Sequence, residues 1–189
     1  PINQGVSIAA IMPVDAPEED WENLQIVFAT SSGGVRRNAL SDFTNVRSNG
    51  KIAMKLPKNV LLVNARICDE NMDFLLTTEM GKAIRFSVNA VRIFKGRDSI
   101  GVRGIKLAAG DNVVSMAVIH HVDVTSEERS AYFKMRRAIT GDETGESKET
   151  ASALSQERYA ELSALEEWIL AITASGFGKR SSAHEYRVS

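Results

Sequence analysis

The sequence predicts an all-β protein built from repeated units of about four short strands, with an α-helical insertion at about 125–166. Three observations support this fold class. One segment recurs three times, short β-branched and aromatic runs flank its glycines, and one acidic block of helical character separates the second and third copies. Four short strands per roughly 48 residues is the size of a propeller-type blade, and the chain would hold a partial set of blades.

The recurring segment is defined by a threonine three residues before a glycine and an arginine four residues after it. An apolar or aromatic residue follows ten positions after the glycine. Glycine supplies the positive φ that tight hairpin turns require, so each copy predicts a turn between two strands. The copies are Thr30, Gly33, Arg37 and Phe43; Thr78, Gly81, Arg85 and Val91; and Thr173, Gly176, Arg180 and Tyr186.

The first two copies continue alike, which predicts equivalent strands in each. Residues 50–56 match residues 101–107, and an apolar run follows each of them. Alternating and β-branched composition is typical of strands. The predicted strands and matched segments are 26–30, 35–37, 50–56 and 60–67 in the first copy, and 74–78, 83–86, 101–107 and 112–119 in the second.

These patterns divide the chain into one β domain with an insert. We expect the end of a preceding blade, with its last strand, at 1–14 and blades at 22–67 and 71–122. The helical acidic insert would occupy 125–166 and the start of a next blade 167–189. Because a few blades leave raw sheet edges, we interpret the chain as a fragment of a closed assembly.

The insert carries clear helix signals. Thr125 and Glu128 form a capping-box pattern that predicts a helix of about three turns, and a second helix is expected at about 155–165. Tyr159, Leu162 and Leu165 are spaced for one apolar face of that second helix. Residues 140–150 read as a mobile loop. A solvated decoration is the simple interpretation; an acidic regulator of polyanion affinity, or a partner site, is the alternative.

Charge is segregated although the net charge is only −1. Residues 1–122 carry a net +2, residues 123–167 a net −5 and residues 168–189 a net +2. Two stretches, 30–58 and 79–106, each carry a net +5. If the copies are equivalent units, these bases gather on one surface, which indicates a polyanion partner. An ordinary solvated surface remains the alternative.

The residues for catalysis or metal binding are missing. His120, His121 and Asp123 lack further ligands at metal spacing, and no phosphate-cradling loop or nucleophile elbow is present. His184 is expected at the surface. Cys68 is the single cysteine, which excludes an internal disulfide and fits a reducing cytoplasm. No apolar run approaches the roughly 20 residues that span a bilayer, so no membrane partner is expected.

The repeats resemble the C-terminal domain of the A subunit of bacterial DNA gyrase. The resemblance is carried by residues 28–43, by Gly101–Leu107 and by residues 176–186. It implies a β-pinwheel, a propeller-like disc in which neighbouring blades exchange strands and duplex DNA wraps around a basic rim. A Gln-Arg-Arg-Gly-Gly-Lys-Gly run found in the first blade of that family is absent here. The C-terminal domain of the topoisomerase IV A-type subunit is therefore an alternative identification.

The resemblance implies a parent enzyme rather than an active fragment. The parent would be a type II DNA topoisomerase, an ATP-hydrolysing isomerase that introduces negative supercoils. Its partners would be double-stranded DNA, the rest of the gyrase A protein and the gyrase B protein in a heterotetramer, in the cytoplasm with the nucleoid. ATP and Mg²⁺ would belong to that holoenzyme, and this chain would hold no cofactor and no catalytic residue.

The expected DNA contacts are bases of the matched hairpins and the strands and loops beside them. They would bind phosphates rather than base edges. The predicted set is Arg36, Arg37, Arg47, Lys51, Lys82, Arg85, Lys95, Arg97, Arg103, Lys179 and Arg180. A protein-binding propeller with incidental bases is the competing interpretation. A sugar- or metabolite-binding repeat protein is disfavoured because no aromatic residue recurs at matched turn positions.

Overall fold

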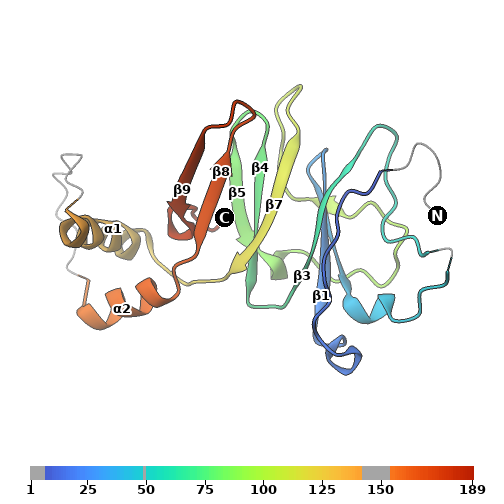
Figure 1. The fold of residues 1–189 in the computed structure, drawn as a ribbon, viewed down its shortest axis with the longest axis horizontal. Helices are drawn as coiled ribbons and strands as arrows, with labels where there is room; N and C mark the ends of the chain where they lie inside the picture. Colours follow the sequence, from blue (N-terminus) through green and yellow to red (C-terminus); the bar gives the residue numbers. More distant parts are fainter. Residues whose placement is uncertain (1–6, 49, 142–153) are drawn as a thin grey trace. The chain divides into compact units, whose positions relative to one another are not determined.

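The computed structural model describes residues 7–48, 50–141 and 154–189. This part of the chain forms three separate sheets, and its two α-helices lie between the second and third of them in sequence (Figure 1). The strands are β1 (Gln25–Thr30), β2 (Gly34–Ala39), β3 (Leu62–Cys68), β4 (Met72–Thr78), β5 (Ala83–Ser87), β6 (Val102–Arg103), β7 (Val113–His120), β8 (Trp168–Ile172) and β9 (Gly178–Ser182). The helices are α1 (Ser126–Thr140) and α2 (Gln156–Ala164), and 3-10 turns occupy Glu18–Asp20, Leu40–Phe43, Val88–Ala90 and Ala183–Glu185.

The chain divides into two compact units. The first contains the described residues up to Ile119 together with Val188–Ser189, and the second is His120–Arg187. The first unit holds the sheets of the first two repeats. The second holds the two helices and the β8–β9 hairpin. The expected combination of β blades and a helical insert is confirmed.

The first sheet has the strand order β3-β1-β2-β6, so its fourth strand comes from the second repeat. β1 pairs antiparallel with both β2 and β3, and Phe28 faces Arg36 on one side and Ala65 on the other. Every residue of β1 is buried. The expected exchange of strands between neighbouring repeats is thus present where β6 pairs with β2.

Alternation along β1 distributes its side chains between two cores. Val27 and Ala29 join the core shared with the second sheet, where Phe74 and Leu76 of β4 are fully buried. Phe28, one position out of phase, enters a second cluster on the opposite face. Because strand side chains alternate with a period of two, both faces of β1 need covering, and neither repeat buries its apolar residues alone.

The second sheet has the order β5-β4-β7, and Phe74 stacks on Phe86 across it with ring centroids 5.1 Å apart. Cys68 at the end of β3 lies in the shared core, and burial raises the pKa of its thiol to about 12. A buried thiol of this kind is chemically inert and acts as a small apolar side chain.

Two contacts between successive repeats are equivalent. The backbone carbonyl of Arg37 accepts from the amide of Phe94 at 2.8 Å, and the carbonyl of Arg85 accepts from the amide of Ser189 at 2.8 Å. Parallel bridges join Arg37 to Ile93 and Arg85 to Val188. The same pair of backbone contacts is therefore made at Arg37 and at Arg85.

The helical unit follows its sequence signals closely. The Thr125 hydroxyl accepts from the Glu128 amide and the Glu128 carboxylate accepts from the Thr125 amide, which completes the expected capping box. Ser155 caps α2, and Tyr132 and Leu162 are buried between the helices. Leu165 is 44% exposed, so the prediction that it shares the apolar face of α2 was wrong. Most of the loop expected at 140–150 lies outside the described residues.

Two expected strands do not form. Residues 50–56 form no strand, although the matching segment, residues 101–107, contains β6. Residues 7–14 also form no strand; Ala10 and Met12 instead pack against the outer cluster of the first sheet. The close approach of β6 to β2 requires a glycine at position 101, since a Cβ there would lie 2.2 Å from the Val35 oxygen. No helix among the described residues is long and apolar enough to cross a membrane.

Candidate nucleic-acid interface

The three hairpin turns that carry the bases have the same hydrogen bonds. The hydroxyl of Thr30, Thr78 or Thr173 accepts from the amide four residues later at 3.0, 3.1 and 3.1 Å. The glycine amide donates to the carbonyl of the same threonine at 2.9, 3.0 and 2.9 Å. The turn glycines Gly33, Gly81 and Gly176 have φ of 82°, 82° and 87°. The Thr-x-x-Gly pattern therefore builds one turn geometry in all three repeats.

The arginine four residues after the glycine occupies one register but three environments. Arg37 faces Val27, Arg85 faces Leu75 and Arg180 faces Leu170 across the hairpin. Their side chains nevertheless have different partners. Arg37 donates to the Asn89 side chain at 3.0 Å, Arg85 pairs with Asp73 at 2.7 Å, and Arg180 lies 4.2 Å over the Trp168 ring.

Three predicted DNA contacts lie in the interior. Arg36 is fully buried, Arg37 is 5% exposed and Arg85 is 2% exposed. The Arg36 guanidinium donates to the carbonyls of the next repeat at Gly96, Arg97 and Ser99, and desolvation by burial lowers its pKa. Arg36 and Arg37 stabilise the contact with the following repeat, and Arg85 pairs with Asp73 inside its own hairpin. The expected position of these three side chains on an exposed rim is therefore corrected.

The physical reason for this correction is visible in the repeat itself. The strand bearing Arg36 and Arg37 is covered by residues 89–99 of the following repeat. Buried arginines persist where carbonyls or a carboxylate satisfy them, because an unpaired buried charge is costly. For Arg85, the sequence did contain a sign of burial in an ion pair. Asp73 lies on β4 two residues before Leu75, which is the cross-strand partner of Arg85.

The other eight predicted bases remain available at the surface, two of them partly. Lys51 is half-buried and donates to the Asp42 carbonyl at 2.7 Å, and Arg97 is half-buried and donates to the Ile52 carbonyl at 3.4 Å. The first unit presents six of the eight and the second unit presents two. The exposed ones are Arg47, Lys82, Lys95, Arg103, Lys179 and Arg180.

Sequence reasoning missed bases in both units. In the first unit Arg92 is exposed and lies 4.4 Å over the Phe94 ring. In the second unit Arg129, Arg136 and Arg137 line a pocket between α1 and the β8–β9 hairpin. These arginines were overlooked because only the net charge of the whole block, which is negative, was considered. Helical spacing of the individual bases was the signal that could have found them.

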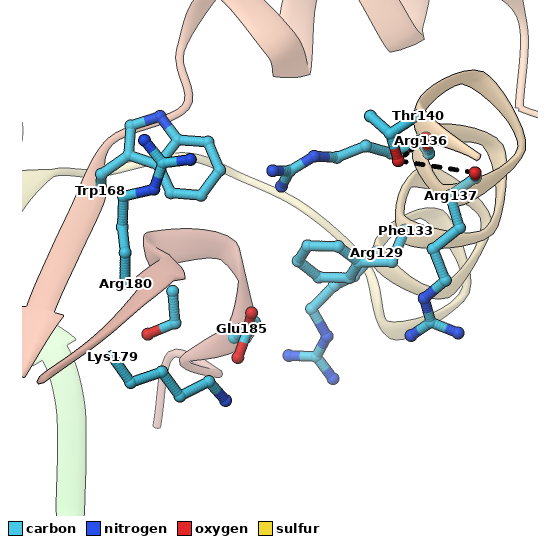
Figure 2. A pocket seen from close by; sticks show the side chains of 10 residues that line it. Arg129, Phe133, Arg136, Arg137, Thr140, Trp168, Lys179, Arg180 and Glu185 are labelled. Carbon is cyan, nitrogen blue, oxygen red and sulfur yellow. Dashed lines mark hydrogen bonds between the residues drawn. The ribbon is translucent and has the colours of Figure 1, made fainter. Parts of the chain in front are cut away.

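The pocket of the second unit has a volume of about 640 Å³ and a basic lining. Figure 2 shows the α1 side chains on one side and Trp168, Lys179 and Arg180 on the other. Arg136 pairs with Glu166 at 2.7 Å and also lies 4.5 Å over the Trp168 ring. The lining residues are Arg129, Phe133, Arg136, Arg137, Thr140, Trp168, Lys179, Arg180, Ser181 and Glu185.

His184 and His121 have different surroundings. His184 was expected at the surface but is 2% exposed. Its Nε2 donates to the Leu162 carbonyl at 2.9 Å, and its ring meets Tyr132 edge to face. It therefore fastens the 3-10 turn after β9 to the helices. His121 lies 3.2 Å from Asp123, and the described residues contain no group of three metal-binding side chains.

The chain matches a known family in the segments that carry the repeats. The family described as "DNA gyrase C-terminal domain, beta-propeller" matches residues 25–69, 73–120 and 167–189. The matched ranges leave out residues 121–166, which contain α1 and α2. The helices are thus an addition to the family pattern, as the sequence indicated.

Similar proteins agree with this match. The chain is 47% identical to the DNA gyrase A protein of Granulibacter bethesdensis over 96% of its own length, and 42% identical to that of Rickettsia bellii over its whole length. It spans 21% of each of these relatives, about a fifth of their length. It is also 33% identical to the DNA gyrase A protein of Haemophilus influenzae over 98% of its length.

Solved structures show the same fold. The C-terminal domain of DNA topoisomerase IV matches with a TM-score of 0.57 and 27% identity, over 64% of this chain and 36% of that one. The C-terminal domain of DNA gyrase A matches with a TM-score of 0.56 and 19% identity, over 87% of this chain and 40% of that one. The second likeness concerns the fold alone. The curated relatives favour gyrase over the topoisomerase IV alternative.

The family match is accompanied by three turns of one geometry, by equivalent backbone contacts at Arg37 and Arg85, and by a strand of the second repeat that pairs in the sheet of the first. The chain belongs to the β-propeller family of DNA gyrase C-terminal domains.

Proposed function

We propose that this chain is part of the DNA-wrapping domain of a gyrase A protein and holds duplex DNA by its phosphates. The observation that supports this is the set of exposed bases on repeats of the gyrase C-terminal type. Each such repeat presents exposed bases on its turn, its loops or its strands, such as Lys82 in the turn of the second repeat and Lys179 on β9 of the third. Contacts of this kind carry no base readout, so binding is sequence-tolerant and salt-dependent.

The number of bases sets a limit on the salt dependence. If each of the eight surface bases neutralised one phosphate, the slope of log K against log salt would be no steeper than roughly −7. Bending a 20–30 base-pair site costs about 1–6 kcal/mol, which several phosphate contacts offset. A chain with fewer phosphate-binding bases binds DNA more weakly and bends it less.

In the parent gyrase, this domain would present a chosen DNA segment to the breakage and rejoining site. We infer that ATP hydrolysis, Mg²⁺ and strand chemistry come from the rest of the gyrase A protein and from the gyrase B protein in the heterotetramer, in the cytoplasm with the nucleoid. The chain itself binds and orients DNA. Directional wrapping is what would turn strand passage into negative supercoiling.

The test is fluorescence anisotropy of a duplex of about 40 base pairs, titrated with the full chain at several salt concentrations. The variant replaces four exposed bases of the proposed set by alanine: Arg47, Lys82, Lys95 and Arg103. The matched control removes the same charge from exposed bases outside the set: Lys55, Lys58, Arg66 and Lys106. Circular dichroism checks that both variants fold.

We expect the first variant to lose affinity and to flatten the salt slope by about 3–4, as four lost phosphate contacts would. The control variant should retain the wild-type slope. Equal loss in both variants would leave only non-specific charge attraction. Absence of wild-type binding at low salt would overturn the proposal for this chain.

A further inference from the structure

We propose that α1 and the β8–β9 hairpin form an additional phosphate-binding groove for duplex DNA, so that the insert extends the DNA interface. This inference rests on the proposed function, because it names a further contact for the same ligand. It differs from the simple interpretation of the insert as a solvated decoration and from the alternative of an acidic regulator. It concerns only the second unit, whose described residues place all the groups involved.

The basic side chains of α1 share one face. Arg129, Arg136 and Arg137 are separated by seven and eight residues, which places them on one side of an α-helix. Phe133 and Thr140 complete that side and also line the pocket. Figure 2 shows the Arg136 side chain extending from α1 toward Trp168 of the hairpin.

Two acids of the insert, Glu128 and Glu161, pair with Arg158 rather than with the arginines of the groove. Arg158 of α2 pairs with Glu128 of α1 at 2.9 Å across the contact between the helices, and with Glu161 at 2.8 Å within α2 itself. The pKa of Glu128 is lowered by the hydrogen bond from the Thr125 amide and, next in importance, by the hydrogen bond from the Arg158 side chain. Four more acids belong to residues 142–153, outside the described part of the chain: Asp142, Glu143, Glu146 and Glu149.

The groove is left with more positive charge than its own acid balances. Five bases and one acid, Glu185, line it. Arg136 is paired with Glu166, but among the described residues no carboxylate lies within 4.0 Å of Arg129, Arg137 or Lys179. Like charges gathered around a concave surface raise the local concentration of anions. An anionic ligand is therefore the favoured occupant.

Trp168 organises the arginines at the groove wall. Arg136 and Arg180 lie 4.5 and 4.2 Å from its ring, and the ring is 41% exposed. A guanidinium stacked on an aromatic face keeps its N–H edge available for hydrogen bonds. Arg136 uses this edge for Glu166, whereas Arg180 can offer it to a phosphate. The Trp168 ring can also pack on a sugar beside that phosphate.

The length of the groove favours a polymer over a single anion. Arg129 and Arg137 are eight residues apart, so α1 separates them by roughly 12 Å, which is about the rise of three to four base pairs. One phosphate cannot contact both ends of such a row. A duplex backbone, which repeats its charges at this scale, contacts both.

The test compares two single charge removals on the same helix in the full chain. Arg129→Ala removes a base that lines the groove, whereas Lys134→Ala removes an exposed base of α1 outside the groove. The double variant R129A/R137A enlarges the effect, and R129K/R137K restores the charge. Binding of the same 40 base-pair duplex is measured across salt concentrations.

A second readout reports on the groove itself. Trp21→Phe leaves Trp168 as the single tryptophan, since the chain has two. Addition of duplex to this variant should change the Trp168 emission in a salt-sensitive manner. Poly-glutamate serves as the probe for an acidic protein partner.

We expect R129A to flatten the salt slope by about 1 and R129A/R137A by about 2, with K134A at the wild-type value and R129K/R137K close to it. Equal behaviour of R129A and K134A, with Trp168 emission unmoved by DNA, overturns the inference while wild-type binding keeps the proposed function intact. A Trp168 response to poly-glutamate but not to DNA overturns it in favour of an acidic protein. Loss of all wild-type binding instead overturns the proposed function.

Discussion

The β1–β2 and β8–β9 hairpins have the same turn and the same cross-strand register, yet one is buried and the other is not. Phe28 of β1 is 2% exposed, whereas Leu170 of β8 is 64% exposed and Ile172 is 68% exposed. β1–β2 lies between β3 and β6 with clusters on both faces, while β8 and β9 pair only with each other among the described residues. The turn is thus local chemistry, and burial is supplied by neighbouring repeats.

The largest expected difference between repeats concerns the equivalent arginines. Arg85→Ala should lower the free energy of unfolding by about 3–5 kcal/mol, because it leaves the buried Asp73 carboxylate without its cation. Arg180→Ala, which removes an exposed contact with Trp168, should cost less than about 1 kcal/mol. Urea denaturation followed by circular dichroism measures both. The double variant D73A/R85A should recover part of the loss, and equal costs for R85A and R180A would contradict the comparison.

The turn glycines test the same contrast at intermediate size. Gly33→Ala and Gly81→Ala both place a side chain at positive φ, which costs about 1–2 kcal/mol each. At Gly33 the new Cβ would also lie 2.9 Å from the Ile105 oxygen, whereas at Gly81 nothing lies within 4 Å. G33A should therefore be the more destabilising by a further 1–3 kcal/mol or so in urea denaturation. A G81A variant as unstable as G33A would show that packing adds nothing at this turn.

The smallest effect isolates the local part of the motif. Thr173→Val removes the hydroxyl that accepts from the Phe177 amide at 3.1 Å in an exposed turn. The expected cost is about 0.5–1 kcal/mol, a fall in hydrogen-exchange protection of the Phe177 amide of roughly two- to fivefold. Thr173→Ser, which keeps the hydroxyl, serves as control. Unchanged protection in T173V would mean that the side chain does not hold the turn.

Much of the fold was predictable because its signals are short-range. The Thr-x-x-Gly pattern predicted three hairpins, and the Thr125–Glu128 pair predicted the start of α1. Strand β6 and the missing strand at residues 50–56 were harder. Their local sequences match, and only β6 has the edge of β2 to pair with.

The candidate site was predictable only in part. Exposed bases such as Lys82 and Arg103 follow from the sequence, but the burial of Arg36 does not, since its partners are carbonyls about 60 residues away. His184 was misjudged for the same reason, because α2 supplies its partner. The basic face of α1 was hidden by averaging the charge of a whole segment.

The amino-acid sequence alone was enough to predict the repeat, its turns and the start of α1, because the hydrogen bonds of each turn and cap join residues three or four positions apart. The repeated pattern of these residues also indicated the family. The tertiary structure decided which arginines are structural and which face solvent. Arg37, Arg85 and Arg180 occupy the same position in their repeats and differ only in what packs against them. Burial and pairing of a charge are set by groups distant in sequence, so no local pattern can specify them.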